Sequence, residues 1–221
     1  NISGLAPGNY SVIVKGLKGC TTSGTVSISQ PSVLTATLSS PTYNGGFNIA
    51  CNGGNSGSAI SNVSGGVSPY TFTWSSTPTQ TTANASNLTA GNYTLTIKDA
   101  NNCLLTKTIS LTQPAPLNAA IGSQQNVLCF GNSTGSATLN TVGGATPYTY
   151  TWSTSPVQTG SVVTNLSAGL YSVNIKDANN CATSTTLNIT QPIAPLTASL
   201  SNIINVACYG NSTGGATVST S

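Results

Sequence analysis

Hydrophobic and polar residues alternate with a period of two along several short segments of the chain. Tyr70, Phe72 and Trp74 alternate with Thr71 and Thr73, so this segment has one aromatic face and one polar face. The same alternation recurs at residues 10–14, 93–98, 109–111, 171–175 and 187–189. The pattern predicts β-strands with one buried face, and no segment sustains the 3.6-residue period of a helix.

Glycine and asparagine pairs separate these expected strands. They stand at residues 65–66, 101–102, 143–144 and 179–180. Such pairs are typical of turns. About seven short strands in roughly 80 residues is the pattern of a β-sandwich, so we expect an all-β fold.

The chain repeats itself with a period close to 78 residues. The segment Pro69–Trp74 returns as Pro147–Trp152, and Lys98–Cys103 returns as Lys176–Cys181, in both cases 78 residues later. The pair Gln-Pro recurs as well, and so does a Cys-x-Gly sequence that begins at Cys51, Cys129 and Cys208. Several independent motifs keep the same spacing, which indicates tandem repeats.

The repeat spacing predicts four segments. They are the C-terminal part of a repeat (1–31), two complete repeats (32–114 and 115–192) and the N-terminal part of a further repeat (193–221). We therefore expect the chain to be a fragment of a longer protein. The Gln-Pro linkers carry further prolines and favour extended backbone, so we expect the repeats to form an extended rod.

Two aromatic positions indicate an immunoglobulin-like sandwich. Trp74 and Trp152 fall on the third strand of their repeats, where such folds bury a tryptophan between the sheets. Tyr93 and Tyr171 follow a Leu-x-x-Gly-x sequence that resembles a tyrosine corner, in which the hydroxyl bonds to backbone just upstream. We expect all four side chains to be structural core, since a stacking platform for sugars needs exposed aromatic rings.

Composition restricts the possible functions. Only 3% of the residues are charged, namely five Lys and two Asp, while His, Arg, Glu and Met are absent. There is no histidine for base catalysis, and two acids 78 residues apart make a poor catalytic pair, so we expect no enzyme and no cofactor. Five scattered lysines do not suit nucleic acid, and no apolar run is long enough to insert into a membrane.

The combined motifs resemble a known family. The order Cys-x-Gly, Gly-Gly-x-x-Pro-Tyr-x-Tyr/Phe-x-Trp, Leu-x-x-Gly-x-Tyr, Lys-Asp-Ala-Asn-Asn-Cys and Gln-Pro is similar to the SprB repeat of giant cell-surface adhesins in gliding Bacteroidetes. The resemblance implies an extracellular protein associated with the outer membrane, exported by type IX secretion and driven by the gliding machinery. The first partial repeat departs from it, with Lys15-Gly16-Leu17-Lys18-Gly19-Cys20 in place of Lys-Asp-Ala-Asn-Asn-Cys.

The two acids also suggest a calcium site, which we consider less favourable. Calcium binds six to eight oxygens and usually several carboxylates. Each complete repeat offers one acid, Asp99 or Asp177, and the first partial repeat has Gly16 at that position. We expect each aspartate to hydrogen-bond its own turn, and we expect no metal.

Six cysteines without other metal-ligand types indicate disulfides in an oxidising environment. Pairing within repeats would join Cys51 to Cys103 and Cys129 to Cys181. Pairing of neighbours in sequence would use all six residues: Cys20–Cys51, Cys103–Cys129 and Cys181–Cys208.

A third connectivity joins one repeat to the next. In an immunoglobulin-like strand order Cys51 lies at the C-terminal pole of its repeat and Cys103 at the N-terminal pole, roughly 30 Å away. A disulfide needs Cα atoms within about 7 Å, so this distance argues against pairing within the repeat. The C-terminal pole of one repeat instead faces the N-terminal pole of the next. This hypothesis pairs Cys51 with Cys181 and leaves Cys20, Cys103, Cys129 and Cys208 to pair beyond this fragment or its ends. It stays open beside the pairing within repeats.

These observations favour a structural stalk segment of a long adhesin, which spaces an adhesive tip from the cell and transmits force between neighbouring repeats in gliding motility. One alternative is a module that binds surface polysaccharide or substratum through the variable loops 75–85 and 153–163. Another is lateral assembly into a filament, because uncharged threonine-rich edge strands do not prevent it.

Overall fold

The computed structural model describes residues 1–220, which form β-strands, turns and loops without any helix. The all-β prediction is therefore confirmed. The chain folds as two compact units, and each is described by itself. Unit 1 consists of Asn1–Pro41 and Asn55–Thr112, and unit 2 consists of Thr42–Gly54 and Gln113–Ser221.

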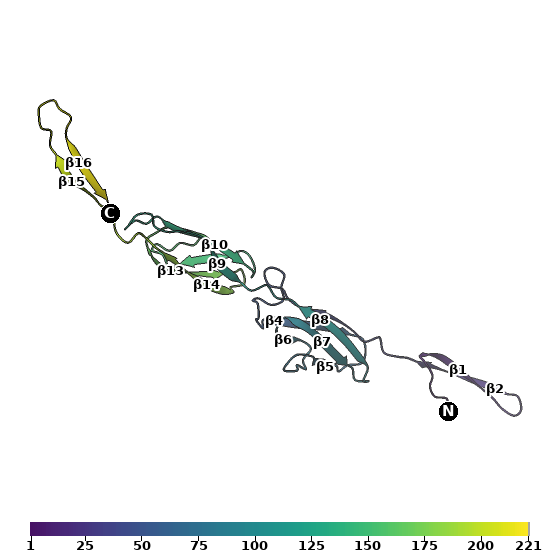
Figure 1. The fold of residues 1–221 in the computed structure, drawn as a ribbon. Coiled ribbons are helices and arrows are strands. Elements are labelled where there is room, and N and C mark those ends of the chain that lie inside the picture. The colour runs from purple at the N-terminus through teal and green to yellow at the C-terminus, as the bar shows by residue number, and fades with distance from the viewer. Residues whose placement is uncertain (221) are drawn as a thin grey trace. The chain divides into compact units, whose positions relative to one another are not determined.

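Unit 1 contains a β-hairpin and two three-stranded antiparallel sheets. The hairpin pairs β1 (Gly8–Lys15) with β2 (Thr21–Ile28). The sheets have the strand orders β3-β4-β6 and β5-β7-β8. Their strands are β3 (Thr35–Ser39), β4 (Gly57–Ser64), β5 (Thr71–Trp74), β6 (Ala85–Leu88), β7 (Gly91–Lys98) and β8 (Leu104–Leu111). Figure 1 labels β4 to β8.

Unit 2 repeats this arrangement. Its sheets have the orders β12-β10-β9 and β11-β13-β14, and a second hairpin pairs β15 (Ala198–Ile204) with β16 (Gly215–Thr220). The strands of the two sheets are β9 (Asn118–Gln125), β10 (Gly135–Val142), β11 (Thr149–Trp152), β12 (Val162–Leu166), β13 (Gly169–Lys176) and β14 (Ala182–Ile189).

The core of unit 2 lies between its two sheets. Trp152 of β11 packs in one cluster with Val163 of β12 and Ile175 of β13, so side chains from both sheets meet. Each of these is at most 1% exposed. Trp74 has the same place in unit 1, again 1% exposed. Each indole Nε1 donates to a backbone carbonyl eight residues downstream, at 3.1 Å from Trp74 and 2.9 Å from Trp152.

Each complete repeat has six strands in the described part of the chain, rather than the expected seven or so. After Trp74, residues 75–84 form a loop, within the region 75–85 that the sequence predicts as a loop. The amide of Gln80 holds this loop to β6: its Nε2 donates to the Ser86 carbonyl at 2.8 Å, and its Oε1 accepts from the Ser86 N–H at 3.0 Å. The side chain thus replaces the backbone partner that another strand would supply.

The tyrosines make the hydrogen bond expected of a tyrosine corner. The Tyr93 hydroxyl donates to the Thr89 carbonyl and the Tyr171 hydroxyl to the Ser167 carbonyl, both at 3.0 Å. Tyr10 in the first hairpin donates to Ala6 at 2.8 Å. In all three cases the acceptor lies four residues upstream, so one local contact fixes the entry to this strand in every copy.

The first hairpin has the sequence pattern of β7 and β8 but exposes its apolar side chains. Val12 is 54% exposed, while Leu95, its equivalent in β7, is fully buried. The hairpin β15-β16 likewise leaves Leu200 and Val218 exposed. Among residues 1–220 neither hairpin has the opposing sheet that covers the same positions in a complete repeat.

The Gly-Gly turn before each Pro-Tyr sequence is built around positive φ angles and close backbone contacts. In unit 2 the Gly144 N–H donates to Ala115 at 2.9 Å, and the Tyr148 hydroxyl donates to the Gly143 carbonyl at 2.7 Å. A Cβ on Gly143 would overlap the carbonyl of Pro116. Glycine is needed here both for its φ of +77° and for this approach.

Gly143→Ala is expected to destabilise unit 2 by more than the ~1–2 kcal/mol that a left-handed φ alone costs, because Cβ also overlaps the Pro116 carbonyl. Gly131→Ala is the matched control, since Gly131 has a similar φ of +78° and open space around it. Urea unfolding followed by Trp152 fluorescence in a Trp74→Phe background measures both. Equal losses for the two variants would contradict the role given to the Pro116 contact.

Candidate functional site

A buried aspartate organises the Lys-Asp-Ala-Asn-Asn-Cys turn of unit 2. Oδ1 of Asp177 accepts hydrogen bonds from the N–H groups of Asn179 and Cys181, both at 2.9 Å. Oδ2 accepts from Ala145 at 2.9 Å, so the turn is also tied to the segment after the Gly-Gly pair. A Cβ on Gly144 would stand 2.6 Å from Oδ2, which explains why glycine precedes Ala145. The aspartate thereby fixes the position of the cysteine.

Asp99 makes the same bonds in unit 1. Its carboxylate accepts from Asn101 at 2.9 Å, Cys103 at 2.8 Å and Val67 at 3.0 Å. Desolvation opposes ionisation of Asp99, but the N–H donors of Val67, Cys103 and Asn101 outweigh it, so its pKa lies below the ordinary value. The expectation that each aspartate bonds its own turn is confirmed by these contacts.

The Cys-x-Gly sequences all form the same turn. The N–H three residues after the cysteine donates to the cysteine carbonyl at 3.0 Å for Cys51, 3.1 Å for Cys129 and 3.2 Å for Cys208. The glycine of each Cys-x-Gly sequence has a positive φ, of +73°, +78° and +82° in the three copies. A residue with a side chain is strained there, so the glycine makes this turn possible.

A disulfide joins these two kinds of turn in unit 2. Cys51 is bonded to Cys181, with Cα atoms 5.6 Å apart and 130 residues between them in sequence. Of the three connectivities considered above, this is the one between repeats. Cys20, Cys103, Cys129 and Cys208 are free and exposed.

Neutral side chains surround the disulfide on both sides. Asn179 Nδ2 donates to the carbonyls of Asn44 and Ala50, each at 3.1 Å, while its Oδ1 accepts from the Asn44 N–H at 3.0 Å. Gln113 Oε1 accepts from the Gly53 N–H at 2.8 Å, and Asn52 Nδ2 donates to the Pro114 carbonyl at 3.0 Å. We call the disulfide with these contacts the cystine clamp.

The cysteines of the clamp can be identified from the sequence pattern, but its amides cannot. Asn179 was expected only to form a turn and Gln113 only to stand in a linker, yet both bind residues 42–54. Gln191 shows that the linker contact is general, because its Oε1 accepts from Gly131 at 2.9 Å. The signal was present in the sequence, since Gln113 and Gln191 each follow the glycine of a Cys-x-Gly by 60 residues.

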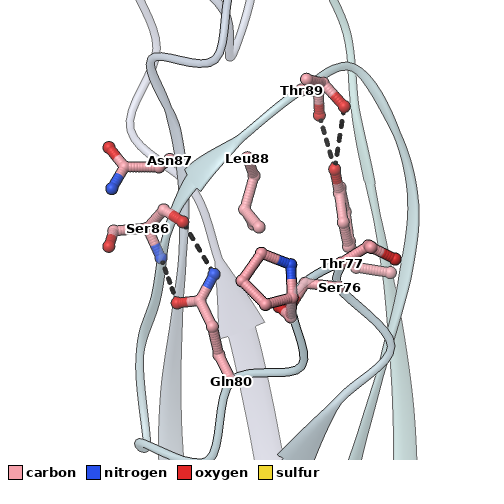
Figure 2. Close-up of a pocket in the computed structure, with 9 residues that line it drawn as sticks. Ser76, Thr77, Gln80, Ser86, Asn87, Leu88 and Thr89 are labelled. Carbon is pink, nitrogen blue, oxygen red and sulfur yellow. Dashed lines mark hydrogen bonds between the residues drawn. The ribbon is translucent and has the colours of Figure 1, made fainter.

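A small pocket recurs beside the tyrosine corner of both complete repeats. In unit 1 it has a volume of 260 Å³ and lies between the loop of Ser76 to Gln80 and the end of β6, as Figure 2 shows. In unit 2 the equivalent pocket has 300 Å³. Figure 2 also shows the amide of Gln80 bonded to Ser86. The hydroxyl of Tyr93 is bonded to Thr89. Because these polar groups are bonded within the protein, they favour a structural role for the pocket, in which its lining residues hold the loop.

No group of three His, Cys, Asp or Glu side chains within residues 1–220 is placed to hold a metal ion. Buried side-chain nitrogen and oxygen atoms in the same range all have hydrogen-bond partners. The described part of the chain contains no helix of the length and hydropathy that a membrane-spanning helix needs.

Unit 1 is expected to lose stability as the pH falls below about 4, the ordinary aspartate value. Because the pKa of Asp99 is lower in the folded state, the unfolded chain takes up the proton first as the pH falls. The stabilisation that the ionised carboxylate gives at higher pH is then lost as the pH falls through the folded-state pKa. Asp99 is the one acidic side chain of unit 1, so Asp99→Asn should remove this pH dependence and lower stability at pH 7.

The measurement is urea unfolding from pH 7 to pH 2, with Trp74 fluorescence as the reporter in a Trp152→Phe background. Asp177→Asn is the matched control, since it changes the equivalent turn of unit 2. An Asp99→Asn variant that keeps the acid-dependent loss of the parent would contradict this account.

Comparison with known proteins identifies a repeat family in two segments. The family model of the SprB repeat matches residues 48–79 and 121–157, one segment in each complete repeat, which confirms the resemblance there. A solved structure of three N-terminal domains of the bacteriophage RB49 Highly Immunogenic Outer Capsid protein (Hoc) is 17% identical, covering 86% of this chain and 69% of that one. Its TM-score of 0.45 supports no assignment. The curated proteins gave no significant match. The SprB matches indicate a segment of an adhesin-like cell-surface protein.

Proposed function

We propose that the chain is a stalk segment of a long cell-surface adhesin, which spaces an adhesive tip from the cell and transmits force through covalently clamped repeats. The observation that carries the proposal is the disulfide between Cys51 and Cys181. A bond of this span changes how the chain bears tension, whatever the arrangement of the two units.

Tension applied to the two ends of the chain passes through the disulfide. It reaches Cys51 from one side and Cys181 from the other, so residues 52–180 form a closed loop that the load bypasses. Strands β4 to β8 and β9 to β13 lie inside this loop. Only β3 and β14 of the two sandwiches lie outside it. The clamp thus protects most of both sandwiches from being pulled open.

The chemistry of the chain supports a structural role over catalysis. Lacking His, Arg and Glu, it has few groups for acid–base or nucleophilic work, and both of its acids are buried in turns. The polar side chains that line the pockets beside the tyrosine corners are hydrogen-bonded to other groups of the protein. This favours the stalk function over polysaccharide binding by each repeat.

The resemblance to SprB repeats supports the cellular setting of the proposal. An extracellular protein exported by type IX secretion would meet the oxidising conditions in which Cys51–Cys181 persists. Neighbouring repeats would be its direct partners, and the gliding machinery would supply the force.

Single-molecule stretching of the chain by its two ends tests the load path. With the disulfide intact, residues 52–180 should stay out of the extension. Reduction, or Cys51→Ser, should lengthen the fully stretched chain by roughly 430–470 Å, since each extended residue spans ~3.3–3.6 Å.

Cys103→Ser is the matched control, because Cys103 is free and exposed and its loss should leave the stretched length unchanged. A stretched length that does not change on reduction would overturn the clamped load path and with it the stalk function proposed here.

A further inference from the structure

The surface of unit 2 that holds residues 42–54 is made from positions that recur in unit 1. Gln113 and Pro114 come from the linker before β9, and Asn179 and Cys181 come from the aspartate turn. In unit 1 the same motifs supply Gln30, Pro31, Asn101 and Cys103. Asp99 holds the turn as Asp177 does, with the Cys103 N–H at 2.8 Å and the Cys181 N–H at 2.9 Å from the carboxylate.

On unit 1 this surface forms an open pocket of 390 Å³. Gln30, Pro31, Leu34, Asp99, Asn101 and Cys103 are among the residues that line it. Burial differs between the two units in the way an absent segment would produce. Pro114 is fully buried and Cys181 is half-buried, whereas Pro31 and Cys103 are exposed.

We propose that this pocket of unit 1 is the docking site for the Cys-x-Gly loop of a preceding repeat, the one to which residues 1–31 belong. The occupant is a neutral loop that brings a thiol to Cys103 and backbone groups to Gln30 and Asn101. Cys51–Cys181 shows the same pairing one repeat later. Each complete repeat then offers a Cys-x-Gly loop to one neighbour and an aspartate turn to the other.

Bond formation at this site is an oxidation. The Cys103 thiol and the thiol of the occupant together lose two protons and two electrons as their sulfur atoms join. An oxidised low-molecular-weight disulfide accepts them and leaves as two thiols. Docking supplies selectivity, because exposure alone does not distinguish Cys103 from Cys20, Cys129 and Cys208.

The test uses the whole chain and a synthetic peptide with the sequence of residues 42–54, in a buffer of reduced and oxidised glutathione. Peptides linked by disulfides are then mapped, and the Cys51–Cys181 link is checked in the same digest. We expect the peptide on Cys103 in roughly tenfold or greater excess over each other free cysteine, because docking raises the local thiol concentration.

Two controls separate docking from reactivity. A scrambled peptide that keeps its cysteine should lose the preference, and so should Asn101→Ala, which removes the amide equivalent to Asn179 but leaves the thiol. Equal labelling of all four free cysteines would overturn the proposal. Dimers linked from Cys103 to Cys129 that outcompete the peptide would also overturn it, since the site would then belong to a second copy of the chain.

The docking site at Cys103 rests on the proposed function in one respect, because both require that the repeats continue in series. Capture of the peptide at Cys103 is measured without force, and the stretching experiment involves Cys51 and Cys181. Failure of one is therefore distinguishable from failure of the other.

Discussion

The arrangement of unit 2 depends on a covalent bond between two turns that are 130 residues apart in sequence. Closing a loop of this length removes about 5 kcal/mol of chain entropy from the unfolded state in the loop-entropy account. The hydrogen bonds around it join neutral, partly exposed groups and contribute about 1 kcal/mol each. The disulfide is thus the strongest single interaction that keeps residues 42–54 in unit 2, and the amides of Asn44 and Asn179 orient the two turns for it.

The motifs of the repeat converge on the position of one cysteine. The carboxylate of Asp177 accepts a hydrogen bond from the N–H of Cys181, and Gly144 leaves room for this carboxylate. The hydroxyl of Tyr148 donates to the carbonyl of Gly143. The glutamine of the linker then holds the loop that carries the partner cysteine. A chain with almost no charge therefore uses both of its acids in the same structural position, where each ties a turn to the segment after a Gly-Gly pair.

Sequence analysis could predict what depends on local patterns. Alternation predicted the strands, the repeat spacing placed Trp74 and Trp152 at equivalent positions, and turn chemistry predicted that Asp99 bonds its own backbone. What it missed depends on contacts between distant segments. The amides of Asn179 and Gln113 are indistinguishable from ordinary polar residues until the segment they bind is known. The contact between Gln80 and Ser86, which holds the loop after Trp74 to β6, was similarly missed.

The most direct test of the account is a disulfide map of the unreduced native protein, made by mass spectrometry after digestion with a chymotrypsin-like protease. The account predicts a peptide pair that links Cys51 to Cys181. It also predicts that this pair disappears in Cys181→Ser while the peptides with the free cysteines stay unchanged. A link from Cys51 to Cys103, or from Cys129 to Cys181, would contradict the clamp and the load path derived from it.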